Sequence, residues 1–193
     1  MIYIVSGDGA RCGSTMMMSA LDAGGMDCVW GRAYDREVGL KEQYGAGFPD
    51  PEKYDGKVVK ALPPPWGGGL KLIAGDYKVV WIHRPAIFRW KSFLKLQKRA
   101  YDVKTMADVH MELRTAFKQE GGDHRAVTIN AEYCEARAKE TLGVMGIRND
   151  MDVLRIDYDD ICSDPLNVFT WMQEEGWPIA PLAAAQIPRK VER

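Results

Sequence analysis

Excess charge of one sign, clustered cysteines and long apolar runs are all missing from this sequence. The formal net charge of -1 argues against a broad nucleic-acid-binding face, which needs a marked basic excess. The 4 cysteines are widely spaced and form neither a Cys-x-x-Cys pair nor a Cys/His cluster, so they predict neither a zinc site nor a disulfide framework. An anionic ligand must therefore be held by a few locally placed cations.

Membrane and secretion signals are missing as well. No apolar run approaches the roughly 20 residues that a membrane-spanning helix needs. The N-terminus passes from Met1 straight into a short apolar strand and then into glycines, so we expect no signal peptide and no membrane anchor. Reduced thiols are the simplest interpretation of the cysteines, which favours a cytoplasmic location. With 193 residues, 46% of them hydrophobic, the chain is predicted to form a single domain over residues 1–193.

Short β-rich apolar segments alternate with helical segments along the chain. Strands are predicted at 2–6, 28–30, 57–62, 78–82 and 152–156, and helices at 14–23, 70–74, from about 86 to 100, 105–119, 130–143 and 165–175. The alternation predicts an α/β fold of the P-loop type, with three layers and a central parallel sheet flanked by helices. Ligands of such sheets bind outside the carboxyl ends of the strands. Three of these ends carry residues 11–15, Lys60 and Arg84.

The segment 6–15, SGDGARCGST, joins the first predicted strand to the first predicted helix. Backbone N–H groups of such a turn can converge on an anion, and Ser14 and Thr15 add hydroxyl donors. The alternative is a tight turn whose glycines supply only backbone freedom. The segment is not a Walker A loop, because no lysine precedes Ser14 and the glycine spacing is one residue too long. Its cation is Arg11, which favours a terminal phosphate or phosphosulfate over a triphosphate with magnesium.

Within this segment, Arg-Cys-Gly-Ser-Thr resembles the 5′-phosphosulfate loop of the sulfotransferase superfamily, which reads roughly Lys/Arg-Ser-Gly-Thr-Thr after a strand. The resemblance implies that the co-substrate is PAPS (3′-phosphoadenosine 5′-phosphosulfate) and that no metal is required. The cytosolic branch continues with a tryptophan that stacks on adenine, and a methionine thioether, which also packs against aromatic rings, takes that place here. The donor-binding residues implied by this match are Arg11, Cys12, Gly13, Ser14, Thr15 and Met16.

A second match begins where the fourth predicted strand ends. In sulfotransferases a strand ends in arginine, and a serine eight residues later on the following helix completes the 3′-phosphate site. Arg84 and Ser92 have this spacing, although Pro85 follows the arginine directly where the family usually has Asp-Pro. Ser92 is expected on the same face of the helix as Pro85, because their separation of seven residues spans close to two turns. Taken singly, Arg84 is an ordinary strand-end cation and Ser92 an ordinary helix serine.

Two looser matches extend the resemblance from residue 1 to about residue 178 and into the tail. The segment 152–165, DVLRIDYDDICSDP, resembles the family's strand followed by Tyr-Glu-Asp-Leu and a later Asp-Pro, which implies that Tyr158 lies near the nucleotide. A core or capping role for Tyr158 is the alternative. Arg189 and Lys190 resemble the late basic segment that closes over the 3′-phosphate, and a solvated basic terminus is the competing interpretation.

Sulfonate transfer requires that the protein position donor and acceptor, stabilise charge on the bridging oxygen and remove a proton. Fixed cations can meet the developing charge, and Arg11 and Lys60 are the candidates. Lys60 lies in KVVKALP and matches the lysine of the family's strand-then-proline segment. A solvated strand-end lysine is the alternative.

The general base is predicted from a different segment. Cytosolic sulfotransferases carry a histidine two residues after that lysine, and Leu62 takes this place here. Other branches use a glutamate after the first helix, in patterns that GLKEQY at 39–44 resembles. Glu42 is therefore the predicted base, because a carboxylate near several cations is ionised and able to accept a proton. Glu37 and His83 follow it as candidates, and plain solvent exposure is the competing interpretation of Glu42.

The acceptor and two rival functions stay open at this stage. Aromatic residues in the segment 30–54 and Trp66 suit a sugar, a phenol or a lipid headgroup, but loop aromatics more often pack on the core. The acceptor is thus a small molecule, or a glycan or lipid hydroxyl or amine, without further definition. One rival is a P-loop kinase, for which Asp159 or Asp160 would have to assist magnesium binding. The other is a non-catalytic nucleotide-binding relative.

Overall fold

The computed structural model describes residues 1–9, 11–29, 54–60, 76–96 and 152–188. In these segments a single parallel sheet of five strands has the order β2-β3-β1-β4-β5. The strands are β1 (Ile2–Gly7), β2 (Asp27–Cys28), β3 (Lys57–Lys60), β4 (Tyr77–His83) and β5 (Asp152–Asp157). The predicted α/β class and parallel sheet are confirmed.

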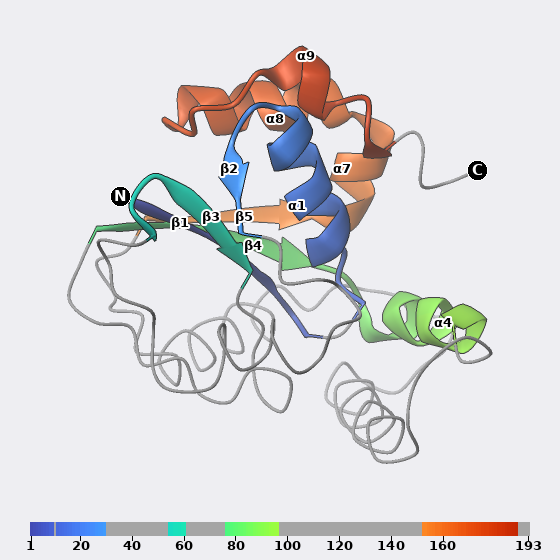
Figure 1. Cartoon of the computed structure of the whole chain (residues 1–193). Helices are drawn as coiled ribbons and strands as arrows, with labels where there is room; N and C mark the ends of the chain where they lie inside the picture. The colour runs from blue at the N-terminus through green and yellow to red at the C-terminus, as the bar shows by residue number, and fades with distance from the viewer. Residues whose placement is uncertain (10, 30–53, 61–75, 97–151, 189–193) are drawn as a thin grey trace.

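The first strand of the chain is the central strand of the sheet. Ile4 pairs with Val59 of β3 on one side and with Val79 of β4 on the other. Every residue of β1 is buried, as expected for a parallel strand covered on both faces, and this explains the apolar run at residues 2–5 with which it begins. Because the three strands are parallel and in register, β1, β3 and β4 end at the same edge of the sheet (Figure 1).

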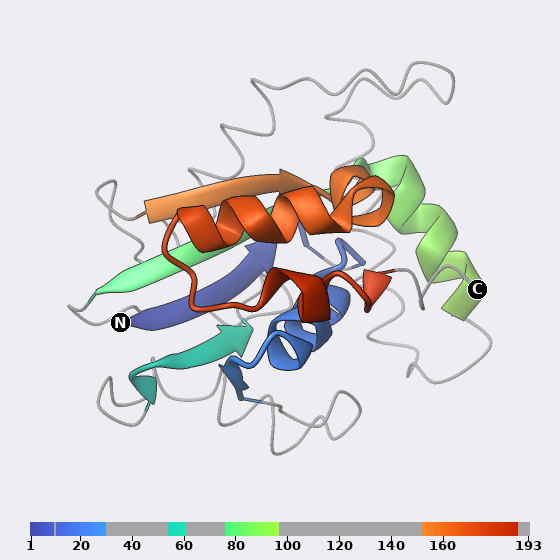
Figure 2. The ribbon, with the colours of Figure 1, turned by 90° about the horizontal axis from the view of Figure 1, so that it is seen from above.

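The helices of the described segments are α1 (Ser14–Ala23), α4 (Ala86–Leu96), α7 (Tyr158–Ser163), α8 (Pro165–Glu174) and α9 (Pro181–Ala184). Figures 1 and 2 show α1, α7, α8 and α9 on one face of the sheet and α4 beyond the carboxyl ends of the strands. None of these helices is long and apolar enough to cross a membrane. The predicted bounds of α1 are confirmed, and α8 ends one residue before its predicted end. The helices α7 and α9 were not predicted from the sequence.

The core between the sheet and its helices is built from alternate strand residues and the inner faces of α1 and α8. Tyr3 and Val5 of β1 pack here, whereas Ile4 is buried on the opposite face of the sheet. The principal members of this core are Val80, Ile82, Leu154, Ile156, Met17, Leu21, Phe169 and Met172. The predicted helices at 70–74, 105–119 and 130–143 lie outside the described residues, as do residues 97–100 at the end of the helix predicted from about 86 to 100.

The last described segment fixes the end of α1. The backbone N–H of Ala180 donates to the carbonyl of Gly24 at 2.9 Å. A Cβ at Gly24 would lie 2.5 Å from Cγ1 of Ile179, so the chain approaches α1 too closely for any side chain there. Trp177 of the same segment packs on Tyr3, with 5.0 Å between ring centroids. The helix that begins the candidate site is therefore held at its far end by a packed and hydrogen-bonded segment.

Candidate functional site

The turn between β1 and α1 contains residues in the left-handed backbone region. The φ angles are 128° at Gly9, 67° at Arg11 and 108° at Gly13. A non-glycine residue in this region costs roughly 1–2 kcal/mol, so the surrounding structure must hold Arg11 there. Left-handed residues within a loop can turn successive backbone N–H groups toward one concave side. Such a concave arrangement, called a nest, binds anions.

The start of α1 adds to this anion-binding geometry. Gly13 is the N-cap residue and supplies no side-chain cap, and the first turn contains no acidic residue. The first intrahelical bond runs from the N–H of Met17 to the carbonyl of Gly13 at 3.0 Å. The N–H groups of Ser14, Thr15 and Met16 therefore precede the helical ladder, at the positive end of the helix dipole, and that of Ser14 hydrogen-bonds the side chain of Cys12. An anion is the natural ligand for such an end.

A lysine from the neighbouring strand lies against the helix start. Nζ of Lys60, the last residue of β3, lies 3.0 Å from Oγ1 of Thr15. Burial lowers the pKa of the Lys60 ammonium, and the positive charge of Arg11 lowers it further. A phosphate or sulfonate bound at the loop would compensate the charge of this half-buried cation.

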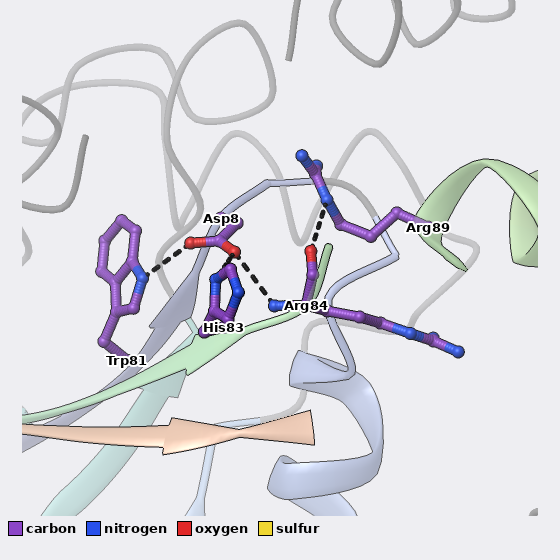
Figure 3. Close-up of polar contacts among 5 residues, drawn as sticks. All are labelled: Asp8, Trp81, His83, Arg84 and Arg89. Atoms are coloured by element: carbon purple, nitrogen blue, oxygen red, sulfur yellow. Dashed lines mark hydrogen bonds and ion pairs between the residues drawn. The ribbon is translucent and has the colours of Figure 1, made fainter. Parts of the chain in front are cut away.

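Asp8 anchors the loop to β4 from inside the protein (Figure 3). One carboxylate oxygen accepts from Nε1 of Trp81 at 2.9 Å, and the other accepts from the backbone N–H of Arg84 at 2.9 Å. The second oxygen also pairs with Nδ1 of His83 at 2.5 Å. Asp8 is 5% exposed and His83 is 8% exposed. Burial favours the protonated acid, but His83, Arg89 and the N–H of Arg84 together hold the pKa of Asp8 below its usual value.

Arg89 ties α4 to the end of the same strand. Its side chain is 1% exposed, and its Nε donates to the backbone carbonyl of Arg84 at 3.1 Å (Figure 3). Asp8, Trp81 and Arg89 were not predicted from the sequence as site residues. The acidic residue directly after a strand that begins with an apolar run was the available signal, because a carboxylate at a buried strand end needs partners.

Arg84 joins three segments of the site. Its Nη1 donates to the carbonyl of Arg11 at 3.1 Å, and its guanidinium carbon lies 3.7 Å from the ring centroid of Tyr158, in cation–π contact. Tyr158 also reaches the loop, since a Cβ at Gly13 would lie 2.5 Å from Cδ2 of the ring. The loop after β1, the end of β4 and the start of α7 therefore meet at Arg84.

Arg11 connects the loop to α4. Its Nε and Nη2 both donate to Oγ of Ser92, at 3.3 Å and 3.2 Å. The two sequence motifs are thus in direct contact, although the structure pairs Ser92 with Arg11 and directs Arg84 to the loop carbonyl and Tyr158.

The predicted site residues divide into three groups by position. Arg11, Gly13, Thr15, Lys60, Arg84, Ser92 and Tyr158 come together at the carboxyl edge of the sheet. Cys12, Ser14 and Met16 are buried, Met16 within the apolar core, and burial raises the pKa of the Cys12 thiol. Glu42, Glu37, Arg189 and Lys190 lie outside the described residues.

No family model, no curated protein and no solved structure matches the chain. In the segments that the structure describes, no group of three or more His, Cys, Asp or Glu side chains is placed to hold a metal ion.

Proposed function

We propose that the protein is a PAPS-dependent sulfotransferase that moves a sulfonate group to a hydroxyl or amine of an acceptor and releases 3′,5′-ADP. The observation that carries the proposal is the contact between the two phosphate motifs, in which Arg84 donates to the carbonyl of Arg11 and Arg11 donates to Ser92. A single nucleotide with a charged group at each end can span elements that touch each other. The parallel sheet supports a P-loop-type fold in this proposal.

The 5′ end of the donor fits the start of α1. The N–H groups of Thr15 and Met16 precede the helical ladder there, and Lys60 and the Thr15 side chain add a cation and a hydroxyl on the side of β3. These groups are positioned for the bridging oxygen between phosphate and sulfonate, where negative charge grows during transfer. The second anion of the donor, on the ribose, fits the side of the loop that faces β4 and α4.

In the reaction, the acceptor oxygen or nitrogen forms a bond to sulfur while the bond from sulfur to the bridging oxygen breaks. The electron pair of the broken bond leaves with 3′,5′-ADP, and the acceptor proton passes to a base. Lys60 stabilises the leaving oxygen, together with the Thr15 hydroxyl beside it. Glu42 stays the base proposed from the sequence, since His83 is paired with Asp8 through Nδ1.

Titration calorimetry on the purified chain tests the nucleotide class. We expect 3′,5′-ADP to bind at least about tenfold more tightly than ATP with magnesium, since the loop lacks the lysine of a triphosphate site. Lys60→Gln is expected to weaken 3′,5′-ADP by about tenfold, the scale of one charge-assisted hydrogen bond. Tighter binding of ATP–Mg²⁺ would favour a kinase instead. Release of 3′,5′-ADP from PAPS over an acceptor panel then separates an enzyme from a non-catalytic relative.

A further inference from the structure

The side chain of Arg11 extends away from the helix start that its own backbone leads into. Both Nε and Nη2 donate to one oxygen, Oγ of Ser92 on α4, at 3.3 Å and 3.2 Å. Lys60, by contrast, contacts Thr15 on the side of β3. Arg11 of the loop and Lys60 of β3 therefore make their contacts on opposite sides of the candidate site.

The Arg11–Ser92 contact presents the donors that an oxyanion needs. The Nε/Nη2 edge of a guanidinium matches two oxygens of a phosphate, and a single hydroxyl oxygen satisfies that edge poorly. While the Ser92 oxygen accepts from Arg11, its O–H remains able to donate to another acceptor. A phosphate placed between the two side chains would receive hydrogen bonds from both.

Arg84 supports this arrangement through the backbone of Arg11. Its Nη1 holds the Arg11 carbonyl at 3.1 Å, and its guanidinium stacks on Tyr158 at 3.7 Å. The Nε of the same guanidinium is buried and has no hydrogen-bond partner among the described residues. A buried donor without an acceptor is costly, and an anion bound beside the loop is one acceptor that could supply the missing bond.

We propose that Arg11, together with Ser92, binds the ribose 3′-phosphate and so determines the preference for a 3′-phosphorylated nucleotide. Lys60, Thr15 and the N–H groups of α1 then serve the 5′ end. This assignment rests on the proposed function. It differs from the sequence match, which places Arg11 at the phosphosulfate and pairs Ser92 with Arg84.

The test compares the affinities of 3′,5′-ADP and 5′-AMP, which differ only in the 3′-phosphate, by calorimetry. Arg11→Gln is expected to weaken 3′,5′-ADP by about 10- to 100-fold and to leave 5′-AMP within about threefold. Ser92→Ala, a smaller change that keeps the loop cation, is expected to lower the same selectivity by about three- to tenfold. Lys60→Gln is the matched control on the opposite side, and it should weaken both nucleotides by the same factor.

Each remaining outcome contradicts a different statement. If Arg11→Gln or Ser92→Ala weakens the two nucleotides equally, the 3′-phosphate assignment is wrong while nucleotide binding stands. If the unaltered protein binds neither nucleotide, or binds both with equal affinity, the proposed function itself fails. A thermal melt of each variant identifies loss of folding, and Ser92→Ala then decides the assignment if Arg11→Gln does not fold.

Discussion

Replacing Asp8 with alanine is expected to lower the free energy of unfolding by about 3–5 kcal/mol, which is the usual cost of removing one partner from a buried ion pair. The substitution leaves the indole N–H of Trp81, the backbone N–H of Arg84 and the imidazole of His83 without their carboxylate. Urea unfolding followed by circular dichroism at pH 7 measures the loss. Nucleotide affinity should fall as well, since the loop loses its side-chain contacts with Trp81 and His83 of β4.

The pH dependence of this effect has a defined sign. The pKa of Asp8 in the folded protein lies below the ordinary value of 3.8, so the folded state favours the ionised carboxylate. The stability that it contributes is present at pH values above 3.8 and is lost as the pH falls below 3.8 and through the lower folded value. The difference in unfolding free energy between the unaltered protein and Asp8→Ala should therefore shrink in acid.

Asp27 provides a matched control for Asp8→Ala. Its carboxylate pairs with Lys57 at 3.4 Å, but it is 68% exposed, so Asp27→Ala should change stability by less than about 1 kcal/mol. A loss from Asp8→Ala as small as that from Asp27→Ala would show that the buried carboxylate does not anchor the loop.

Replacing Gly13 with alanine is expected to destabilise the protein by about 2–5 kcal/mol, because two separate penalties coincide. The residue has a φ of 108°, which alanine adopts at a cost, and the new Cβ would lie 2.5 Å from the ring of Tyr158. The ring cannot shift freely, since Arg84 stacks on it. Thermal and urea unfolding measure the total effect.

Gly25 separates the two penalties. Its φ of 93° is similarly unfavourable for alanine, but nothing lies within 4 Å of the position that a Cβ would take. Gly25→Ala should therefore cost about 1–2 kcal/mol, the backbone penalty alone. If Gly13→Ala costs no more than Gly25→Ala, Tyr158 does not pack against the loop as described.

The parts of the fold that depend on local pattern could be predicted from the sequence. The buried strand β1 begins with the apolar run at residues 2–5, and the bounds of α1 follow from small and apolar residues that end at Gly24. The short helix α7 was missed because YDDICS carries too few periodic apolar residues to be separated from a loop. The order of the strands could not be predicted from the sequence, since the central position of β1 depends on its pairing with the distant strands β3 and β4.

In the candidate site, too, local sequence patterns could be recognised, whereas contacts between residues distant in the sequence could not be predicted. Glycine spacing indicated the loop, and the interval from Arg84 to Ser92 indicated a second phosphate motif. The partner of Ser92 could not be predicted, because Arg11 lies 81 residues away in the sequence and reaches α4 only after the sheet has formed. The side chains around Asp8 likewise come from a strand (Trp81 and His83) and a helix (Arg89), and no local sequence pattern links them to the loop.

A crystal structure with 3′,5′-ADP bound tests the central claim most directly. The account predicts one nucleotide whose 5′-phosphate lies on the N–H groups that begin α1 and whose 3′-phosphate lies between Arg11 and Ser92. Electron density for the nucleotide at any other place, or with only one phosphate in contact with these elements, would contradict it.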